Sequence, residues 1–278
     1  MDGNPDVIID GKYVYFAPAN VADIRNLSKW TRMTFPSGGR TPIVVDMDED
    51  GEMDVLVDGS TWYQAPSSGK RSASNWRTYS LGNTSWAMSV IPYDVDKDGD
   101  TDIVISDRKA ATIWFDHPDT NPYTTWKKRT IHDEPDIRFM KIADIDEDGR
   151  DDFIVTCSDP ERIYFLRRTN SSGNPTVSEI ALSDPVSSFP KGVGVYDYDN
   201  NGNVDIFVLN KGNEWMTEYS GNPLNASSWT RYNLDIDGDR EKMDDAVNFD
   251  IDGDDDMDVI TTEENSGQGV IWFENPLY

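Results

Sequence analysis

Short apolar runs alternate with acidic turns along this chain. Six runs of five residues open on Asp and continue with mostly apolar, β-branched side chains. Continuous apolar runs of this length are typical of strands that are buried on both faces. The six runs are residues 6–10, 54–58, 102–106, 152–156, 205–209 and 258–262.

Three further β-rich runs accompany each of these apolar runs. An aromatic run comes next, at 13–18, 61–66, 112–118, 162–166, 214–219 and 270–276. A run that opens with Trp or a β-former follows, at 30–35, 76–81, 126–131, 177–182 and 229–234. The last run leads into the next acidic turn, at 41–45, 87–93, 138–143, 191–196 and 245–249. No stretch combines a 3.6-residue apolar period with helix caps, so the pattern predicts four short strands per repeat.

The acidic turns are copies of one nine-residue motif. The pattern D-x-D-x-[DN]-G-x-x-D occupies residues 46–54, 94–102, 144–152, 197–205 and, with Asp in place of Gly, 250–258. A truncated copy, Asp2-Gly3 with Asp6, opens the chain. The sixth motif position falls at 3, 51, 99, 149, 202 and 255, which gives steps of 48 to 53 residues. A repeat of this length with four strands in each copy predicts an all-β fold, a β-propeller.

The spacing of the acids in each turn suits a bound cation. Carboxylates at alternate positions of a tight turn converge on one point, and a hard divalent ion such as Ca²⁺ takes 6–8 oxygen ligands. Glycine at position six permits the sharp turn. Mg²⁺ fits less well because it keeps its waters in a rigid octahedron. The alternative is a set of acidic surface turns without metal, since Asp and Gly are ordinary turn residues. The repetition in register favours calcium.

These motifs also carry a family resemblance. The acidic loop between two strands, with the trailing pattern W-[FY]-[DE]-x-P, resembles the FG-GAP/VCBS repeats of integrin-α-like propellers over nearly the whole chain. The resemblance implies Ca²⁺-binding blades, usually extracellular, that serve in adhesion, in glycan binding or beside polysaccharide lyase domains. It implies about five structural Ca²⁺ ions. Their ligands would be Asp46, Asp48, Asp50 and Asp54; Asp94, Asp96, Asp98 and Asp102; Asp144, Asp146, Asp148 and Asp152; Asp197, Asp199, Asn201 and Asp205; and Asp250, Asp252, Asp254 and Asp258.

Three departures from the motif carry expectations of their own. Asp255 stands where the other loops have glycine, so the last turn is expected to be strained or altered. Asn201 lowers the charge of the fourth site and is expected to lower its affinity. The first copy lacks two ligands, so Asp2 and Asp6 are expected to hold no ion unless other residues complete the site.

The strand count predicts one propeller domain over residues 1–278, with about six four-stranded blades or seven if the chain is a fragment. The chain has six of the apolar runs (second strands) and six of the aromatic runs (third strands). It has only five of the runs that follow them (outer strands) and five of the runs that lead into the next acidic turn (inner strands). A ring of six four-stranded blades therefore lacks two strands. A preceding segment, a partner chain that adds a strand, or self-assembly would supply them.

Composition narrows the choice of partners. The chain has 52 acidic and 25 basic side chains, for a net charge of −27, which argues strongly against nucleic acid and anionic membranes as partners. Half of the acids, 26, lie in the five loops, and five Ca²⁺ ions would bring the charge to −17. No apolar run is long enough for membrane insertion. One cysteine, Cys157, excludes an internal disulfide framework and is expected to be an inert buried thiol.

Candidate ligand-binding residues lie out of phase with the repeat. Aromatics in phase, such as Trp62 and Trp114, are expected to pack the blades. Those out of phase, together with nearby cations, are expected on the face opposite the acidic loops: Trp86, Phe189, Trp215, Arg40, Arg138 and Lys191.

The sequence thus predicts an extracellular, cell-surface or virion-surface binding and adhesion module for a glycan or a protein. The alternatives are a structural component of a surface filament or virion, and a domain of a polysaccharide lyase-like protein. An enzyme is not expected, because His117 and His132 are the only histidines and no nucleophile motif or Gly-rich phosphate loop occurs.

Overall fold

The computed structural model of the chain describes residues 6–181, 189–210, 214–219, 222–234, 243–264, 267 and 269–275. These residues form 22 short strands and four single-turn 3₁₀ helices. The chain divides into two compact units, one of residues 1–107 and 112–130 and the other of residues 108–111 and 131–278. The expectation of a single domain stays a prediction.

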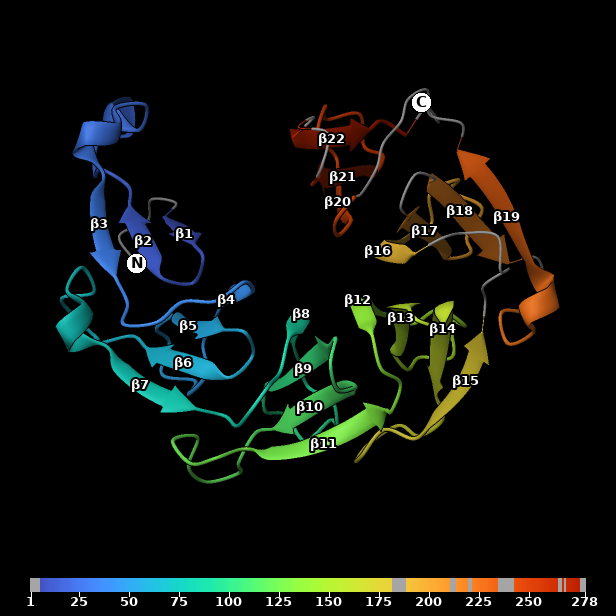
Figure 1. Cartoon of the computed structure of the whole chain (residues 1–278), viewed down its shortest axis with the longest axis horizontal. Coiled ribbons are helices and arrows are strands. Elements are labelled where there is room, and N and C mark those ends of the chain that lie inside the picture. The colour runs from blue at the N-terminus through green and yellow to red at the C-terminus, as the bar shows by residue number, and fades with distance from the viewer. Residues whose placement is uncertain are drawn as a thin grey trace. The chain divides into compact units, whose positions relative to one another are not determined.

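The first unit holds three antiparallel sheets, each labelled in Figure 1. The first sheet has three strands, β1 (Val7–Ile9), β2 (Tyr13–Phe16) and β3 (Thr31–Thr34). The second has four, β4 (Pro42–Val45), β5 (Asp54–Val57), β6 (Thr61–Gln64) and β7 (Arg77–Ser80). The third also has four, β8 (Ala87–Tyr93), β9 (Asp102–Asp107), β10 (Thr112–Asp116) and β11 (Lys127–His132), although the last two residues of β11 count with the second unit.

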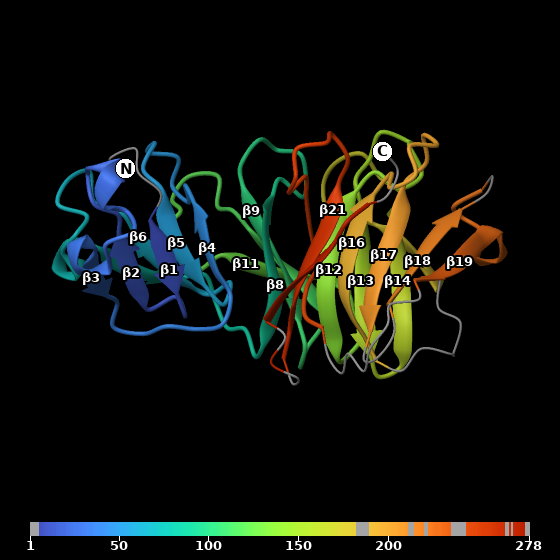
Figure 2. The same cartoon turned by 90° about the horizontal axis from the view of Figure 1, so that it is seen from above.

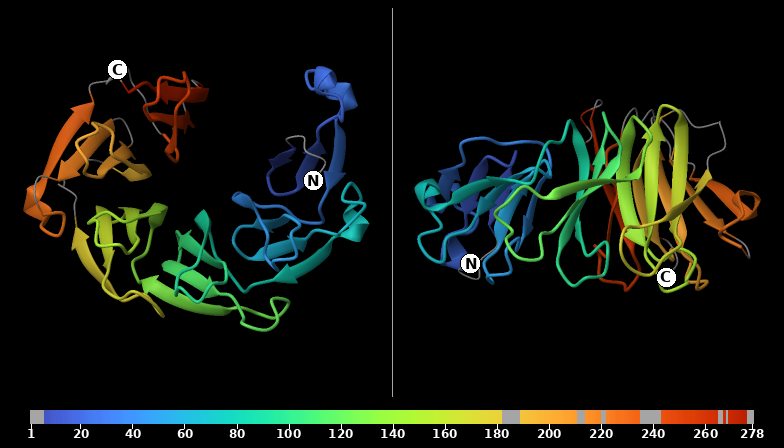
Figure 3. Two further views of the ribbon diagram at one scale, coloured as in Figure 1. Left: turned by 180° about the vertical axis from the view of Figure 1, so that it is seen from behind. Right: turned by 90° about the horizontal axis from the view of Figure 1, so that it is seen from below.

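The second unit also holds three antiparallel sheets. Its first sheet contains β12 (Ile137–Ala143), β13 (Asp152–Ser158), β14 (Glu161–Arg168) and β15 (Val177–Ala181), which lie side by side in Figure 1. Figures 2 and 3 show the same ribbons from other directions. Its second contains β16 (Pro190–Tyr196), β17 (Asp205–Asn210), β18 (Glu214–Tyr219) and β19 (Trp229–Leu234). Its third contains β20 (Val247–Phe249), β21 (Asp258–Glu263) and β22 (Gly269–Phe273).

The order of strands follows the predicted repeat. In each four-stranded sheet the inner strand precedes the acidic loop, and the second, aromatic and outer strands follow in turn. The prediction of about six four-stranded blades is wrong in number, because only four sheets of the described residues have four strands and β1–β3 and β20–β22 have three. Each of these two sheets lacks one strand, which agrees with the two strands that the count of runs in the sequence leaves missing.

In each four-stranded sheet the strand that follows the acidic loop, β5, β9, β13 or β17, is buried along its whole length, as the continuous apolar runs predict. The prediction is wrong for the run 6–10, because Val7 and Ile9 of β1 are exposed. Cys157 at the end of β13 is fully buried and free, which confirms the predicted buried thiol.

Aromatic side chains hold neighbouring sheets together within each unit. In the first unit the Phe35 and Tyr63 rings stack with centroids 4.1 Å apart, in a cluster that includes Val14 and Val55. Trp62 and Trp114 are fully buried, as expected for aromatics that pack the blades, whereas Trp272 in the same phase is 43% exposed. In the second unit, Phe207 belongs to a corresponding cluster with residues of β21 and β22.

A second set of phased tryptophans closes the turns before or at the start of the outer strands. The indole N–H of Trp30 donates to the carbonyl oxygen of Ile24 over 2.9 Å, and that of Trp76 donates to Lys70 over 2.8 Å. Trp126 and Trp229 make the same kind of bond. Three of these turns contain the 3₁₀ helices Leu27–Lys29, Ala73–Asn75 and Ala226–Ser228, and the fourth helix is Val21–Asp23. The in-phase indoles are therefore explained by local structure.

Candidate metal-binding loops

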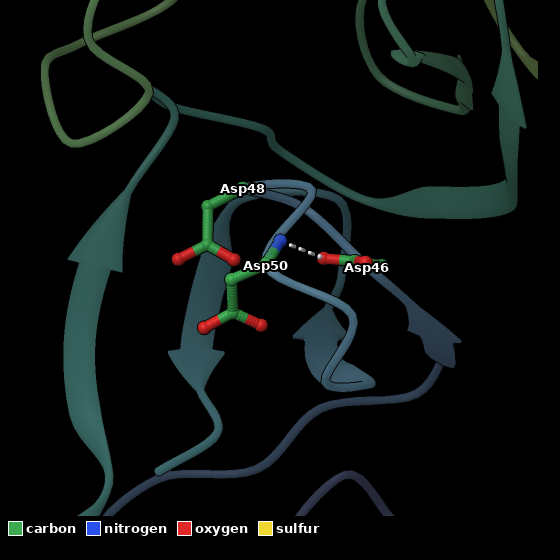
Figure 4. A group of neighbouring side chains, drawn as sticks. All are labelled: Asp46, Asp48 and Asp50. Atoms are coloured by element: carbon green, nitrogen blue, oxygen red, sulfur yellow. Dashed lines mark hydrogen bonds between the residues drawn. The ribbon is translucent and has the colours of Figure 1, made fainter. Parts of the chain in front are cut away.

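Each acidic loop is organised around its first aspartate. In the first loop the backbone N–H groups of Asp50 and Gly51 donate to the two carboxylate oxygens of Asp46, over 3.2 and 2.9 Å. Figure 4 shows the first of these bonds, with the side chains of Asp46, Asp48 and Asp50 around the turn. The same pair of bonds recurs at Asp94, Asp144 and Asp197. The shared spacing of the motif therefore produces one shared turn.

Two positions of every complete loop have a left-handed backbone. Position four holds Glu49, Lys97, Glu147 or Asn200, with φ between 55° and 62°. Position six holds Gly51, Gly99, Gly149 or Gly202, with φ between 85° and 107°. An added Cβ at these four glycines would meet no atom within 4 Å, so the backbone angle alone favours glycine there.

The last loop reverses this use of glycine. Gly253 occupies position four with φ of 83°, and Asp255 occupies position six with φ of 72°. The backbone therefore keeps the common turn and places an aspartate in the left-handed region. This agrees with the expectation of a strained turn, because a Cβ in that region approaches the following carbonyl oxygen.

The loops bring most of the predicted ligands together. In four of them, three carboxylates each place one oxygen within 4.8 Å of the others. The sets are Asp46, Asp48 and Asp50; Asp94, Asp96 and Asp102; Asp144, Asp146 and Asp152; and Asp197, Asp199 and Asp205. Asp98 groups with Asp100 and Asp119 instead, which the sequence did not predict. In the last loop, Asp250 accepts from the backbone N–H groups of Asp254 and Asp255 over 3.2 Å.

The third position of the motif points to a cation. Asp48, Asp96 and Asp146 each keep one buried carboxylate oxygen, Oδ1, that has no hydrogen-bond partner among the described residues. A buried carboxylate oxygen without a partner is costly, and here other carboxylates surround it. Hard oxygen ligands of this kind fit a calcium ion, which would supply the missing positive charge.

The ninth position has a structural role that the motif alone did not reveal. Asp54 accepts bonds from the backbone N–H of Met47 over 3.1 Å, from the backbone N–H of Ala65 over 2.7 Å and from the indole of Trp62 over 2.9 Å. Asp102, Asp152 and Asp258 likewise accept one N–H from their own loop and one from the end of the next strand or the residues just after it. These carboxylates join the loop to the blade. The only sign of this role in the sequence was the regular occurrence of Asp at the ninth position of the motif.

The truncated first copy keeps part of this arrangement. Asp6 accepts the backbone N–H of Ala17 over 2.8 Å, as Asp54 accepts that of Ala65. Asp2 lies outside the described residues. The ninth position therefore retains its structural bond in a copy that lacks other ligands.

Burial changes the titration of the ninth-position carboxylates. Because these side chains are removed from water, the pKa values of Asp54, Asp102 and Asp152 are each raised to about 7. Nearby loop carboxylates raise them further, while the backbone N–H donors lower them. A bound dication would oppose the effect of burial, since it favours the charged carboxylate.

Side chains from outside the loops make the loops unequal. In the first loop, Asp48 accepts the hydroxyl of Tyr123 over 2.8 Å, and this bond raises the pKa of Tyr123 to about 12. In the third loop, Arg167 of β14 forms ion pairs with Asp146 and Asp148, the second over 2.6 Å. Arg150 also pairs with Asp148. The third loop therefore contains positive charge of its own.

The predicted ligand-binding residues largely contact one another. The guanidinium of Arg40 lies 4.0 Å from the centre of the Trp86 ring, and that of Arg138 lies 4.6 Å from the centre of Phe189. These cation–π contacts link the start of one inner strand to the start of the next. Lys191 is buried and forms ion pairs with Asp244 and Glu264. The side chain of Trp215 lies outside the described residues.

Two strand-end carboxylates position the same connections. Asp58 accepts the backbone N–H groups of Arg40 and Thr41 over 2.8 and 3.1 Å. Asp107 accepts those of Ser85 and Trp86 over 2.6 and 2.9 Å. Sequence reasoning missed this role, although Asp58 ends the apolar run 54–58 and Asp107 directly follows the apolar run 102–106. They fix the backbone that presents Arg40 and Trp86.

The first unit also contains a pocket of about 590 Å³ that the motifs did not predict. Ile8, Val14, Phe16 and Trp76 contribute apolar walls. Charged side chains at the pocket are Asp6, Glu52, Lys70 and Arg71. Volumes of this size, with apolar walls and a few polar groups, are typical of small-molecule sites.

Comparisons with known proteins place the repeat in a family. A family model described as an FG-GAP-like repeat matches residues 144–208, which include the third acidic loop and strands β13 to β16. No curated protein matches the sequence at a significant level. Among the described residues, no helix has the length and apolar character that crossing a membrane requires.

One solved structure shows a distant likeness. Its title describes specific recognition of non-reducing terminal N-acetylglucosamine by an Agrocybe aegerita lectin. The two chains are 15% identical with a TM-score of 0.46, and the match covers 85% of this chain and 60% of the other. A similarity at this level supports no inference about function. The matched repeat and the antiparallel sheets together support an FG-GAP-like β-propeller, in which residues 144–208 are an FG-GAP-like repeat.

Proposed function

We propose that this chain is a calcium-stabilised β-propeller that acts as an extracellular binding module. The observation that carries the proposal is the recurrence of one unpartnered buried carboxylate oxygen, on Asp48, Asp96 and Asp146, beside other carboxylates of the same loop. Three equivalent loops with the same unsatisfied oxygen share one need, which is a cation at the centre of the turn.

The chemistry of the loops favours Ca²⁺ over other ions. The predicted ligands are carboxylate oxygens, an amide oxygen at Asn201 and a backbone carbonyl, all of which are hard donors. The ions are structural in this proposal, because each would neutralise repelling carboxylates and fix the turn between two strands. About five ions would bind, and Asn201 in the fourth loop and Arg167 in the third would weaken those two sites.

The proposal includes an extracellular location. Extracellular calcium modules bind at about 10⁻⁴–10⁻³ M, which suits a calcium-rich exterior. The charge of −27 supports the same environment, since a metal-free chain would repel itself strongly.

The binding role has two supporting features in the first unit. Exposed Arg40 and half-buried Trp86 form a cation–π pair whose backbone Asp58 and Asp107 hold in place. The pocket beside Trp76 offers a second surface for a ligand. The proposed ligand is a glycan or a protein, because aromatic rings beside polar groups suit both. Membrane lipid and nucleic acid are not proposed as ligands, because the chain is strongly acidic.

Assembly into a surface filament or virion is the second candidate. Val247, Phe249 and Val270 on the last sheet are 56%, 59% and 71% exposed, and Val7 and Ile9 on the first are 43% and 45% exposed. Both sheets have three strands, and β1 and β22 are edge strands within them. Apolar, incomplete sheets favour a partner chain that completes them.

A lyase-like activity has less support. His132 lies beside Tyr164 with ring centroids 4.9 Å apart and contacts Glu179 over 3.0 Å. Burial raises the pKa of Tyr164 to about 12, so its hydroxyl stays protonated and is a weak base. We therefore propose a role without catalysis.

The test of this function separates metal binding from ligand binding. Calcium titration of the metal-free chain by calorimetry should show several binding events at submillimolar to millimolar Kd. A glycan array probed with the calcium-loaded chain should show saturable binding that Trp86→Ala abolishes. Stable capture of a defined protein partner without glycan binding would favour assembly, and absence of calcium binding would refute the proposal.

A further inference from the structure

The side chain of His117 occupies an unusual position between two acidic loops of the first unit. It follows β10, is 8% exposed, and lies edge-on against Trp126 with ring centroids 4.6 Å apart. Its Nε2 is 3.3 Å from the carbonyl oxygen of Met47. A carbonyl oxygen only accepts, so Nε2 carries the hydrogen in this contact.

The second ring nitrogen of His117 faces a carboxylate. Nδ1 is buried and has no hydrogen-bond partner, and it lies 3.4 Å from Oδ2 of Asp100. In neutral imidazole with hydrogen on Nε2, Nδ1 carries a lone pair. A lone pair that faces a carboxylate oxygen is repulsive unless a proton or a metal ion lies between them.

The carboxylate of Asp100, which lies beside Nδ1 of His117, belongs to a group of three. Asp98, Asp100 and Asp119 each place one oxygen within 4.8 Å of the other two. Asp98 and Asp100 come from the second acidic loop, and Asp119 comes from the connection between β10 and β11. No lysine or arginine within the described ranges forms an ion pair with any of the three. The group therefore combines concentrated negative charge with an available imidazole nitrogen.

We propose that His117, Asp98, Asp100 and Asp119 form a second type of metal site, for a borderline dication such as Zn²⁺. Imidazole nitrogen and carboxylate oxygen are ordinary Zn²⁺ ligands, whereas Ca²⁺ takes oxygen ligands. The 3.4 Å separation of Nδ1 and Oδ2 suits the edge of a tetrahedron, which is about 3.4 Å for bonds of about 2.1 Å. Met47 orients the ring through Nε2, as partners of metal-bound histidines do.

This site is separate from the proposed calcium cluster of the same loop. That cluster consists of Asp94, Asp96 and Asp102. Asp98 is the one predicted calcium ligand that lies instead with Asp100 and Asp119, in the group next to His117. Asp119 and His117 belong to no predicted calcium set. Their variants therefore test the second site without removing a calcium ligand.

The experiment uses the full chain saturated with CaCl₂ and titrated with ZnCl₂, or with CoCl₂ as a coloured probe. Calorimetry should detect one tight Zn²⁺ equivalent, and Co²⁺ should give visible absorption from a site with nitrogen and oxygen ligands. Asp119→Asn and His117→Gln should each weaken binding about tenfold or more. Asp133→Asn and His132→Gln are the matched controls, because Asp133 is exposed and His132 is the other histidine. Both controls should bind like the parent chain.

The outcomes are distinct. Loss of binding in Asp119→Asn, with retention in both controls, supports the site even if His117→Gln does not fold. Zn²⁺ binding that is absent, or equal in all variants, overturns the proposal. A His117 ring that NMR finds doubly protonated at neutral pH, with no change on adding Zn²⁺, also overturns it and leaves an ion pair with Asp100. A separate calcium titration of the same chain tests the proposed function. Failure of the zinc site can therefore be told apart from failure of the proposed function.

Discussion

Gly253 and Asp255 exchange the roles that glycine and an ordinary residue have in the other loops. Both have positive φ, 83° and 72°, but the glycine lies at position four and the aspartate at position six. Glutamate, lysine or asparagine tolerates position four elsewhere, at φ of 55° to 62°. The last loop therefore keeps the shared turn with its glycine at the less demanding position.

Replacing Asp255 by glycine is expected to stabilise the chain. Relief of left-handed strain contributes about 1–2 kcal/mol, and the extra freedom of glycine in the unfolded chain offsets about 0.5–1 kcal/mol. The net gain is therefore about 0.5–1 kcal/mol in urea unfolding with saturating CaCl₂. Gly51→Asp is the reciprocal control and should destabilise by a similar amount. A lower midpoint for Asp255→Gly would contradict this account.

The third and ninth positions of a loop should respond differently to calcium. Asp54→Ala leaves two backbone N–H groups and the indole of Trp62 without their acceptor, which costs about 3 kcal/mol or more with or without metal. Asp48→Asn should reduce stability only in calcium, because in EDTA it removes repulsion among the loop carboxylates. Unfolding of both variants in CaCl₂ and in EDTA checks this, with Asp133→Ala as a surface control. Equal losses for the two variants in EDTA would argue against separate roles.

Arg167 should weaken calcium binding in the third loop. Its guanidinium pairs with Asp146 and Asp148, so a calcium ion has to compete with it or share those oxygens. Arg167→Gln is expected to raise the affinity of that loop about fivefold, which corresponds to about 1 kcal/mol for one partly buried ion-pair network. Calcium calorimetry measures the change. Arg162→Gln, an exposed arginine on the same strand, is the matched control, and an equal effect there would point to net charge alone.

Cys157 should report unfolding of the second unit. Its thiol is fully buried, and burial raises its pKa to about 11, so little thiolate exists at pH 8. Labelling by iodoacetamide should therefore be slow in the native chain and fast in denaturant. Removal of calcium should speed it up, because opening becomes more frequent. Rapid labelling of the calcium-loaded chain would show that the β13 core is not closed as described.

The sequence predicted the strand order because the chain repeats two strong patterns. The apolar run that opens at Asp102 had to be buried on both faces, and β9 is buried throughout. The acidic motif predicted where each loop begins, because a first aspartate and a sixth glycine, such as Asp46 and Gly51, are typical of a tight turn. The count of runs also predicted that two strands are missing, and they are missing from β1–β3 and β20–β22, but it could not predict whether these two sheets form complete blades.

The candidate sites were predictable only in part. The motif located the carboxylates, but it did not separate Asp54, which joins loop to blade, from Asp48, which keeps a free oxygen. The cations Arg138 and Lys191 were expected to face a ligand, yet Arg138 lies on Phe189 and Lys191 forms buried ion pairs. Contacts between residues far apart in the chain decide such roles, and the periodicity of a single strand gives no information about these contacts.

Thermal unfolding with and without calcium tests the central claim most directly. The full chain is measured in saturating CaCl₂ and again in excess EDTA, after elemental analysis confirms that the metal is gone. A calcium-stabilised propeller predicts a substantially lower Tm in EDTA, restored by CaCl₂ but not by an equal concentration of MgCl₂. An unchanged transition in the metal-free chain would contradict the claim that calcium holds these loops.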